Sequence, residues 1–145
     1  MKAIQDEARI IGENGCLAFV YANIVEQIHV DGWDPSTLPC QLKLFADVID
    51  GMLSGHISEG DCYVKDAEKY MHYLDPKHKY RVTKKDIKSM KDLRGEIGAV
   101  RFDHNGKSHW VGFADGTVVF DSLTDSVCRK YGLPTTARIV EIDRW

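Results

Sequence analysis

Three residues far apart in the sequence have the types that nucleophilic catalysis by a thiol requires. Cys16 follows Asn14 and Gly15 at the start of a long apolar segment, His109 begins a short apolar segment, and Asp121 follows the next one. A cysteine attacks as its thiolate, a histidine takes and returns the thiol proton, and a carboxylate orients the imidazole ring. These residue types predict a Cys-His-Asp triad if the fold brings the three side chains together.

Cys16 lies where the sequence predicts the first turn of a helix over residues 16–30. Apolar residues cover nearly the whole circumference of this helix, which is typical of a buried central helix. Helix N-termini and a neighbouring imidazolium lower the pKa of a thiol from about 8.5 into the range of about 3.5 to 7.5. The alternative is that Cys16 is only a small buried hydrophobic residue, which is the commonest role of a free cysteine.

The turn between two predicted strands, 109–113 and 117–120, decides whether His109 and Asp121 can meet. If residues 114–116 form a three-residue loop, His109 pairs directly with Asp121. A two-residue turn instead puts the two side chains on opposite faces of the sheet. We expect the three-residue loop, because its third position requires glycine and a glycine stands there.

The order Cys, His, Asp and the segment SHWVGFADGTVVFDS resemble the papain-like cysteine peptidase superfamily. The chain is most similar to compact bacterial and phage members, such as the peptidase domains that trim bacteriocin leaders and the NlpC-type cell-wall endopeptidases. Residues 14–17, Asn-Gly-Cys-Leu, match the nucleophile segment of this superfamily. The resemblance implies a hydrolase that cleaves a peptide or amide substrate through an acyl-enzyme thioester, without a cofactor. It implies that Cys16 is the nucleophile, His109 the base and Asp121 the residue that orients the base.

The oxyanion-stabilising residue departs from the pattern of this superfamily. Leader-trimming and papain-type enzymes place a glutamine five or six residues before the cysteine, where this chain has Ile11 and Ile10. Gln5 lies 11 residues before Cys16 and serves only if the chain folds back. Asn14 is nearer, and its amide together with the backbone N–H of Cys16 is the second possible donor set.

Two halves of different character must position these residues. The first half, up to about residue 75, predicts helices over 3–11, 16–30, 38–53 and 63–74. The second half, about 76–145, predicts strands over 80–82, 97–102, 109–113, 117–120 and 137–142. Residues 1–145 are therefore expected to form one α+β domain with N-terminal helices, in which a buried central helix packs on a C-terminal antiparallel meander. The resemblance implies that this arrangement is papain-like.

Length, composition and charge exclude several other classes of protein. The chain has 145 residues, of which 43% are hydrophobic and 28% charged, as in ordinary globular proteins. Its net charge of −3 argues against a nucleic-acid partner. No apolar run approaches the roughly 18 to 20 residues of a membrane-spanning helix, and acidic residues stand where a signal peptide has its apolar stretch. We therefore expect a cytoplasmic protein with no membrane partner and four free cysteines.

Other features leave further functions open. Segment 65–94 has 10 Lys and Arg against 5 Asp and Glu, which predicts a solvated basic face or, alternatively, a site for a polyanion. Asp103, His104 and His109 lie near one another in sequence, but they lack the spacing of metal ligands, so we expect no bound metal. The last alternative is a papain-like module that binds a peptide without catalysis. The remaining histidines are expected on helix ends or surfaces, at positions 29, 56, 72 and 78.

Overall fold

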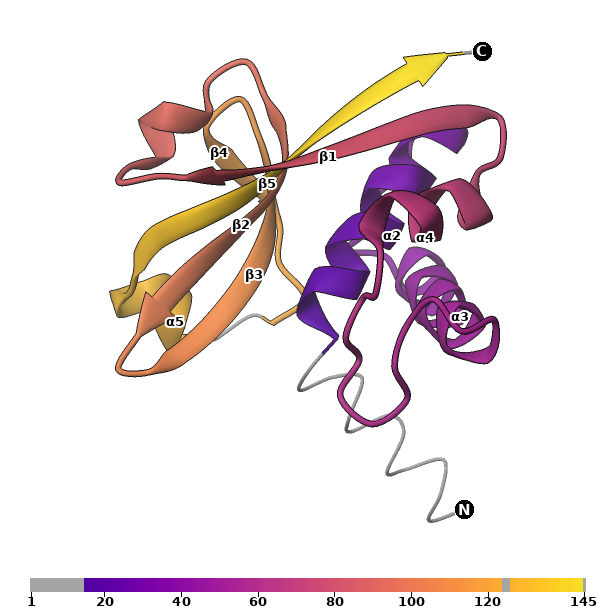
Figure 1. Ribbon diagram of the computed structural model, residues 1–145, viewed down its shortest axis with the longest axis horizontal. Helices are drawn as coiled ribbons and strands as arrows, with labels where there is room; N and C mark the ends of the chain where they lie inside the picture. Colours follow the sequence, from indigo (N-terminus) through magenta and orange to yellow (C-terminus); the bar gives the residue numbers. More distant parts are fainter. Residues whose placement is uncertain (1–14, 124–125, 145) are drawn as a thin grey trace.

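The structure is a computed structural model that describes residues 15–123 and 126–144. These ranges contain four α-helices and a five-stranded antiparallel sheet, which confirms the expected α+β class. Three helices precede the sheet in sequence and pack together beside it (Figure 1): α2 (Cys16–His29), α3 (Leu38–Leu53) and α4 (Ala67–Leu74). The helix predicted over residues 3–11 lies outside the described residues. None of the described helices has the length and hydropathy needed to cross a membrane.

The strand order is β1-β5-β2-β3-β4, which corrects the expected meander. Only β2, β3 and β4 lie side by side in sequence order, and the last strand, β5, lies between β1 and β2. The lysine-rich β1 thereby becomes an edge strand, a position where charged side chains are favoured. The bounds of the five strands are β1 (His78–Asp86), β2 (Ile97–His104), β3 (Lys107–Ala114), β4 (Thr117–Phe120) and β5 (Leu133–Arg144).

Several elements begin or end at residues other than those predicted. β1 and β5 pair over nine positions, so both strands extend well beyond the predicted 80–82 and 137–142, because cross-strand partners hold polar residues in the ladder. α4 starts at Ala67 instead of residue 63, since the Asp66 side chain accepts a hydrogen bond from the Lys69 N–H and caps the helix there. Two short elements were not predicted: η1 (Met90–Leu93) and α5 (Val127–Tyr131).

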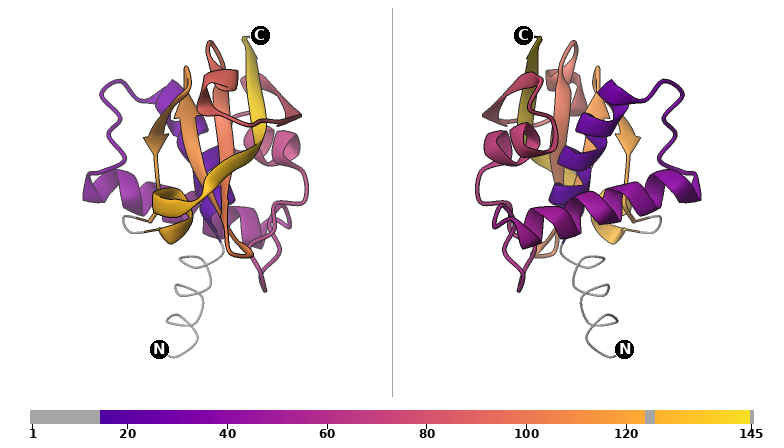
Figure 2. Two further views of the ribbon diagram at one scale, coloured as in Figure 1. Left: turned by 90° about the vertical axis from the view of Figure 1, so that its left-hand side faces the viewer. Right: turned by 90° about the vertical axis from the view of Figure 1, so that its right-hand side faces the viewer.

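Helix α2 is the buried central helix, as predicted. It lies against the sheet, and α3 runs across the helix (Figure 2). Its residues Ala18, Val20 and Ala22 have no exposed surface. A Cβ atom at Gly112 in β3 would lie 3.1 Å from Phe120 and 3.6 Å from Val20. Glycine at this position therefore permits close packing of α2 on β3 and sets the distance between helix and sheet.

The opposite face of the sheet carries a second apolar core. It contains alternate residues of the three central strands, together with one residue each from η1 and α5. These residues are Val100, Phe102, Val111, Phe113, Ala137, Ile139, Leu93 and Cys128, and Ile87, directly after β1, completes the core. The strands β2, β3 and β5 therefore contribute apolar side chains to both cores.

Candidate active site

The structure brings the three predicted triad residues together from three elements. Cys16 is the first residue of α2, His109 lies in β3, and Asp121 directly follows β4. The Nε2 atom of His109 lies 2.6 Å from Oδ1 of Asp121. The Cys16 thiol is hydrogen-bonded to the same imidazole, which leaves Nδ1 as the ring nitrogen for the sulfur. The Cys16 thiol, the His109 imidazole and the Asp121 carboxylate are thus connected by hydrogen bonds.

The turn that aligns His109 with Asp121 differs from the predicted three-residue loop. β3 and β4 are joined by a two-residue loop, Asp115-Gly116, with φ angles of +51° and +76°. An Asp-Gly pair with two positive φ angles is typical of a type I′ turn. A β-bulge then shifts the register by one residue, which reverses the side-chain parity and returns Asp121 to the face of His109. The expected hydrogen bond is present, but the register used to predict it was wrong.

Because β4 is short, part of the edge of β3 is not paired with β4, and the Cys16 thiol contacts β3 there. Among the described residues, β4 pairs with β3 only from Gly112 to Ala114. The backbone N–H of Trp110 therefore has no partner in β4, and it donates to the sulfur of Cys16 instead. Helix α2 packs against β3. The thiol thus occupies the position that a continued β4 would have filled.

The start of α2 provides further positive potential at the sulfur. Gly15 stands at the N-cap, no capping side chain is found among the described residues, and the Leu17 N–H donates to the Cys16 sulfur. The backbone N–H of Cys16 itself lies in the first turn, where helical N–H groups have no acceptor within the helix. The positive end of the helix dipole and these donors favour the thiolate.

The pKa values of Cys16 and His109 move in opposite directions. Burial acts to raise the pKa of Cys16, but the His109 hydrogen bond and charge and the N–H groups of Trp110 and Leu17 lower it below its usual value. Burial acts to lower the pKa of His109, but Asp121 and the Cys16 thiolate raise it to about 9. Both shifts favour a thiolate–imidazolium ion pair near neutral pH.

Asp121 is held in place by two groups that the sequence analysis missed. Burial acts to raise its pKa, but His109, the Leu123 N–H at 2.9 Å and the Arg129 guanidinium at 3.1 Å keep the pKa below its usual value. Arg129 lies in the five-residue helix α5, which was not predicted. The sequence gives little indication of this contact, because Arg129 is only a positive charge eight residues after Asp121.

The predicted oxyanion donors, Asn14 and Gln5, lie outside the described residues. Two pockets lie on either side of the first turns of α2. One, of about 220 Å³, extends to Asp121 and is lined mostly by apolar side chains, including Phe19, Phe45 and Leu123. The other, of about 280 Å³, begins at Leu17 and is lined by both apolar and charged side chains. Of the two pockets, the apolar one reaches the triad, at Asp121.

The chain was compared with models of protein families, with curated proteins and with solved structures. None of them matches. The chemistry of the site is therefore inferred from its own residues, a thiol, an imidazole and a carboxylate joined by hydrogen bonds.

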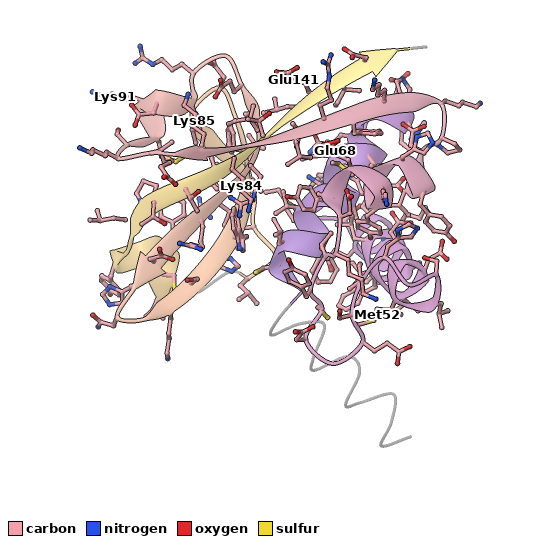
Figure 3. The ribbon with its side chains drawn as sticks, in the orientation of Figure 1. Met52, Glu68, Lys84, Lys85, Lys91 and Glu141 are labelled. Carbon is pink, nitrogen blue, oxygen red and sulfur yellow. The ribbon has the colours of Figure 1, made fainter. Side chains whose placement is uncertain are left out.

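The basic segment is partly neutralised by acidic side chains of neighbouring elements. Arg81 lies 2.6 Å from Asp143 and Lys85 lies 3.4 Å from Glu96. Lys84, Lys85 and Lys91 project from β1 and η1, with Glu68 on α4 and Glu141 on β5 close to the same strand (Figure 3). This mixed charge is typical of a solvated face.

The histidines near the β2–β3 hairpin do not form a metal-binding group with their neighbours. Asp103 accepts hydrogen bonds from Ser108 and Thr135, each at 2.7 Å, while His109 faces Asp121. Within the described part of the chain, one group of histidines and acids is close enough to hold an ion, and it lies elsewhere. Cys16, Cys40, Cys62 and Cys128 all lie within the described residues and form no disulfide bond.

Proposed function

We propose that the protein is a papain-like cysteine hydrolase that cleaves an amide or related acyl bond. The observation that carries this proposal is the chain of hydrogen bonds from Cys16 through His109 to Asp121. A nucleophile at the start of a buried helix, with its base and orienting carboxylate on the adjacent sheet, matches the arrangement that the sequence resemblance implies. The opposite pKa shifts of Cys16 and His109 support the same assignment.

Each residue has one role in the proposed reaction. The Cys16 thiolate attacks the carbonyl carbon and forms a tetrahedral intermediate, which collapses to a thioester as His109 protonates the leaving amine. His109 then takes a proton from water as the water oxygen attacks the thioester carbon. The second tetrahedral intermediate collapses with cleavage of the C–S bond, which releases the carboxylic acid and regenerates the thiolate–imidazolium pair. Asp121 holds Nε2 throughout, so that Nδ1 stays directed at the reacting atoms.

The backbone N–H of Cys16 is the donor that the fold provides for the oxyanion, and the amide of Asn14 or Gln5 is the proposed second donor. The apolar pocket beside Asp121 accommodates an apolar side chain next to the bond that is cleaved. The substrate class is accordingly a peptide or amide with an apolar group beside the reacting carbonyl.

The test is turnover of a panel of peptides, cell-wall amide fragments and acyl thioesters by the full chain. We expect wild type to release product and to carry a transient acyl adduct on Cys16, detected by intact-mass spectrometry. Cys16→Ala removes one small side chain and is expected to fold normally while losing turnover. Cys40→Ala is the matched control, because Cys40 is also half-buried and lies in α3.

Retention of the protein's full biological effect by a well-folded Cys16→Ala variant would contradict the hydrolase. That result would instead favour the module that binds a peptide without catalysis. Salt-sensitive nucleic-acid binding that survives loss of Cys16 would favour the polyanion-binding alternative.

A further inference from the structure

A second cluster of chemically active side chains lies at the other end of α2. His29 is the last residue of α2, Asp75 directly follows α4, and His78 is the first residue of β1. Figure 1 shows the C-terminal ends of α2 and α4 beside the start of β1. The two histidines were expected only on helix ends or surfaces, whereas both imidazoles are directed at the same buried carboxylate.

The donor atoms converge on one point. Nε2 of His29 lies 3.1 Å and Nδ1 of His78 lies 2.7 Å from Oδ2 of Asp75. All three atoms lie within 4.8 Å of one another. A tetrahedral zinc site with Zn–N distances of about 2.0 to 2.1 Å separates neighbouring ligand atoms by about 3.3 Å. Small side-chain rotations therefore bring the three atoms to the spacing that a metal ion requires.

The surroundings of Asp75 resemble the outer hydrogen bonds of a metal-bound carboxylate. The Asp75 side chain is 1% exposed, the Tyr80 hydroxyl donates to Oδ2 at 2.6 Å, and the Lys77 N–H donates to Oδ1 at 3.2 Å. Such hydrogen bonds orient ligating carboxylates in metal sites. The His29 side chain is 37% exposed, so the cluster is open to solvent on this side.

The electrostatic environment also favours a cation. The C-terminal ends of α2 and α4 both lie at the cluster, and helix C-termini carry partial negative charge. Two imidazoles and one carboxylate suit zinc and related transition ions, whereas Ca²⁺ and Mg²⁺ prefer oxygen ligands.

We propose that His29, Asp75 and His78 bind a divalent transition-metal ion of the zinc type. The ion joins the ends of two helices to the first strand, and thereby ties the helical half of the chain to the sheet. This site is separate from Cys16, which lies at the opposite end of α2, and it does not depend on the proposed hydrolase.

The experiment is a calorimetric titration of the EDTA-treated, dialysed full chain with Zn²⁺ at pH 7.5, in a Cys16→Ala background because thiolates also bind zinc. We expect one equivalent to bind, and His29→Ala and His78→Ala each to weaken binding at least tenfold. His56→Ala is the matched control, since it removes an imidazole of the same helical half that is outside the cluster, and it is expected to leave the affinity unchanged. Mg²⁺ is expected to bind at least tenfold more weakly than Zn²⁺.

A second measurement needs no substitution at the histidines. Addition of Zn²⁺ to the Cys16→Ala protein is expected to shift the imidazole NMR signals of His29 and His78 while leaving those of His56 and His104 in place. Absence of zinc binding, or binding that persists in both His29→Ala and His78→Ala, would overturn the proposal. In that case the three side chains form a hydrogen-bonded network only.

Discussion

Both ends of α2 place imidazole beside carboxylate, but in different arrangements. At the N-terminal end His109 lies between a thiol and a carboxylate, each on a different ring nitrogen. At the C-terminal end two imidazoles face one oxygen of Asp75. A linear chain of groups moves a proton between its members, whereas groups that converge on one point hold a cation or a shared set of hydrogen bonds.

The direction of the helix dipole contributes to this difference. The positive end of α2 favours the thiolate of Cys16, and the negative end favours a bound cation beside His29. Each end therefore carries the chemistry that its electrostatic potential supports. The comparison predicts that substitutions at the two ends have separable effects on reactivity and on cation binding.

The largest expected effect comes from the histidine beside the thiol. His109→Ala removes the base and is expected to lower turnover by about 10²- to 10⁴-fold. His78→Ala removes an imidazole at the opposite end of α2 and is expected to change turnover less than about twofold, the size of the scatter between unrelated surface variants. Steady-state rates of the two variants at 25 °C, with circular dichroism to verify folding, check this contrast. A similar loss in both variants would show that the two ends are not independent.

Asp121→Asn is expected to lower the pKa of His109. The carboxylate stabilises the imidazolium and is one cause of its raised pKa of about 9, so its neutralisation moves the pKa toward the ordinary value of about 6.5. At pH 8 the protonated fraction of His109 then falls by about 30-fold if the shift is complete. The alkaline limb of the pH–rate profile measures the change, with Asp143→Asn as an exposed control. An alkaline limb that stays near 9 would contradict the role of Asp121.

A buried acidic pair between two helices, Glu26 on α2 and Asp47 on α3, is expected to make stability depend on pH. Burial and the neighbouring Glu26 raise the pKa of Asp47 to about 7, although Lys43 acts to lower it. The folded chain therefore binds this proton more tightly than the unfolded chain, whose aspartates titrate near 3.9, and stability falls as pH rises between the two values. Between pH 5.5 and pH 8 the ionisation of Asp47 is expected to lower the free energy of unfolding by about 2 kcal/mol.

Urea unfolding of wild type and Asp47→Asn at both pH values tests this expectation. Asp47→Asn is expected to reduce the pH dependence and to stabilise the protein at pH 8. Asp50→Asn, an exposed aspartate of the same helix, is the control. Equal pH dependence in wild type and Asp47→Asn would show that Asp47 is ionised throughout this range.

The smallest effect is expected from Arg129→Ala. Arg129 contacts Asp121 at 3.1 Å, but its side chain is 44% exposed, so solvent screens the ion pair. Exposed pairs contribute about 0.2 to 1 kcal/mol, which corresponds to a loss of about 1.5- to 5-fold in turnover. Lys107→Ala, in which another exposed positive charge is removed, is expected to leave turnover unchanged. A loss as large as that of Asp121→Asn would make Arg129 a principal positioning residue.

The sequence was informative where local patterns decide the structure. The apolar circumference of residues 16–30 predicted a buried helix, and the positions of Cys16, His109 and Asp121 predicted three groups that the structure brings together. The β3–β4 turn shows the limit of such reasoning. A bulge compensates for the two-residue turn, and only the complete ladder reveals it.

Long-range packing decided the features that were not predicted. The position of β5 between β1 and β2, the short helix that carries Arg129 and the cluster around Asp75 all depend on contacts between distant segments. His29 lies far from Asp75 in sequence, and neither residue has a motif that links it to the other. Local propensity and motif spacing contain no information on such contacts.

Limited alkylation of the full chain tests the central claim most directly, because it reports thiolate formation without a known substrate. The protein is treated briefly with iodoacetamide at about pH 6.5, where an ordinary cysteine is protonated, and each thiol is quantified by mass spectrometry. Cys16 and Cys40 are both half-buried, so a difference between them reflects activation more than access. We predict that Cys16 is labelled first and that His109→Ala slows its labelling. Equal labelling of Cys40, or labelling of Cys16 that is unaffected by His109→Ala, would contradict an activated nucleophile.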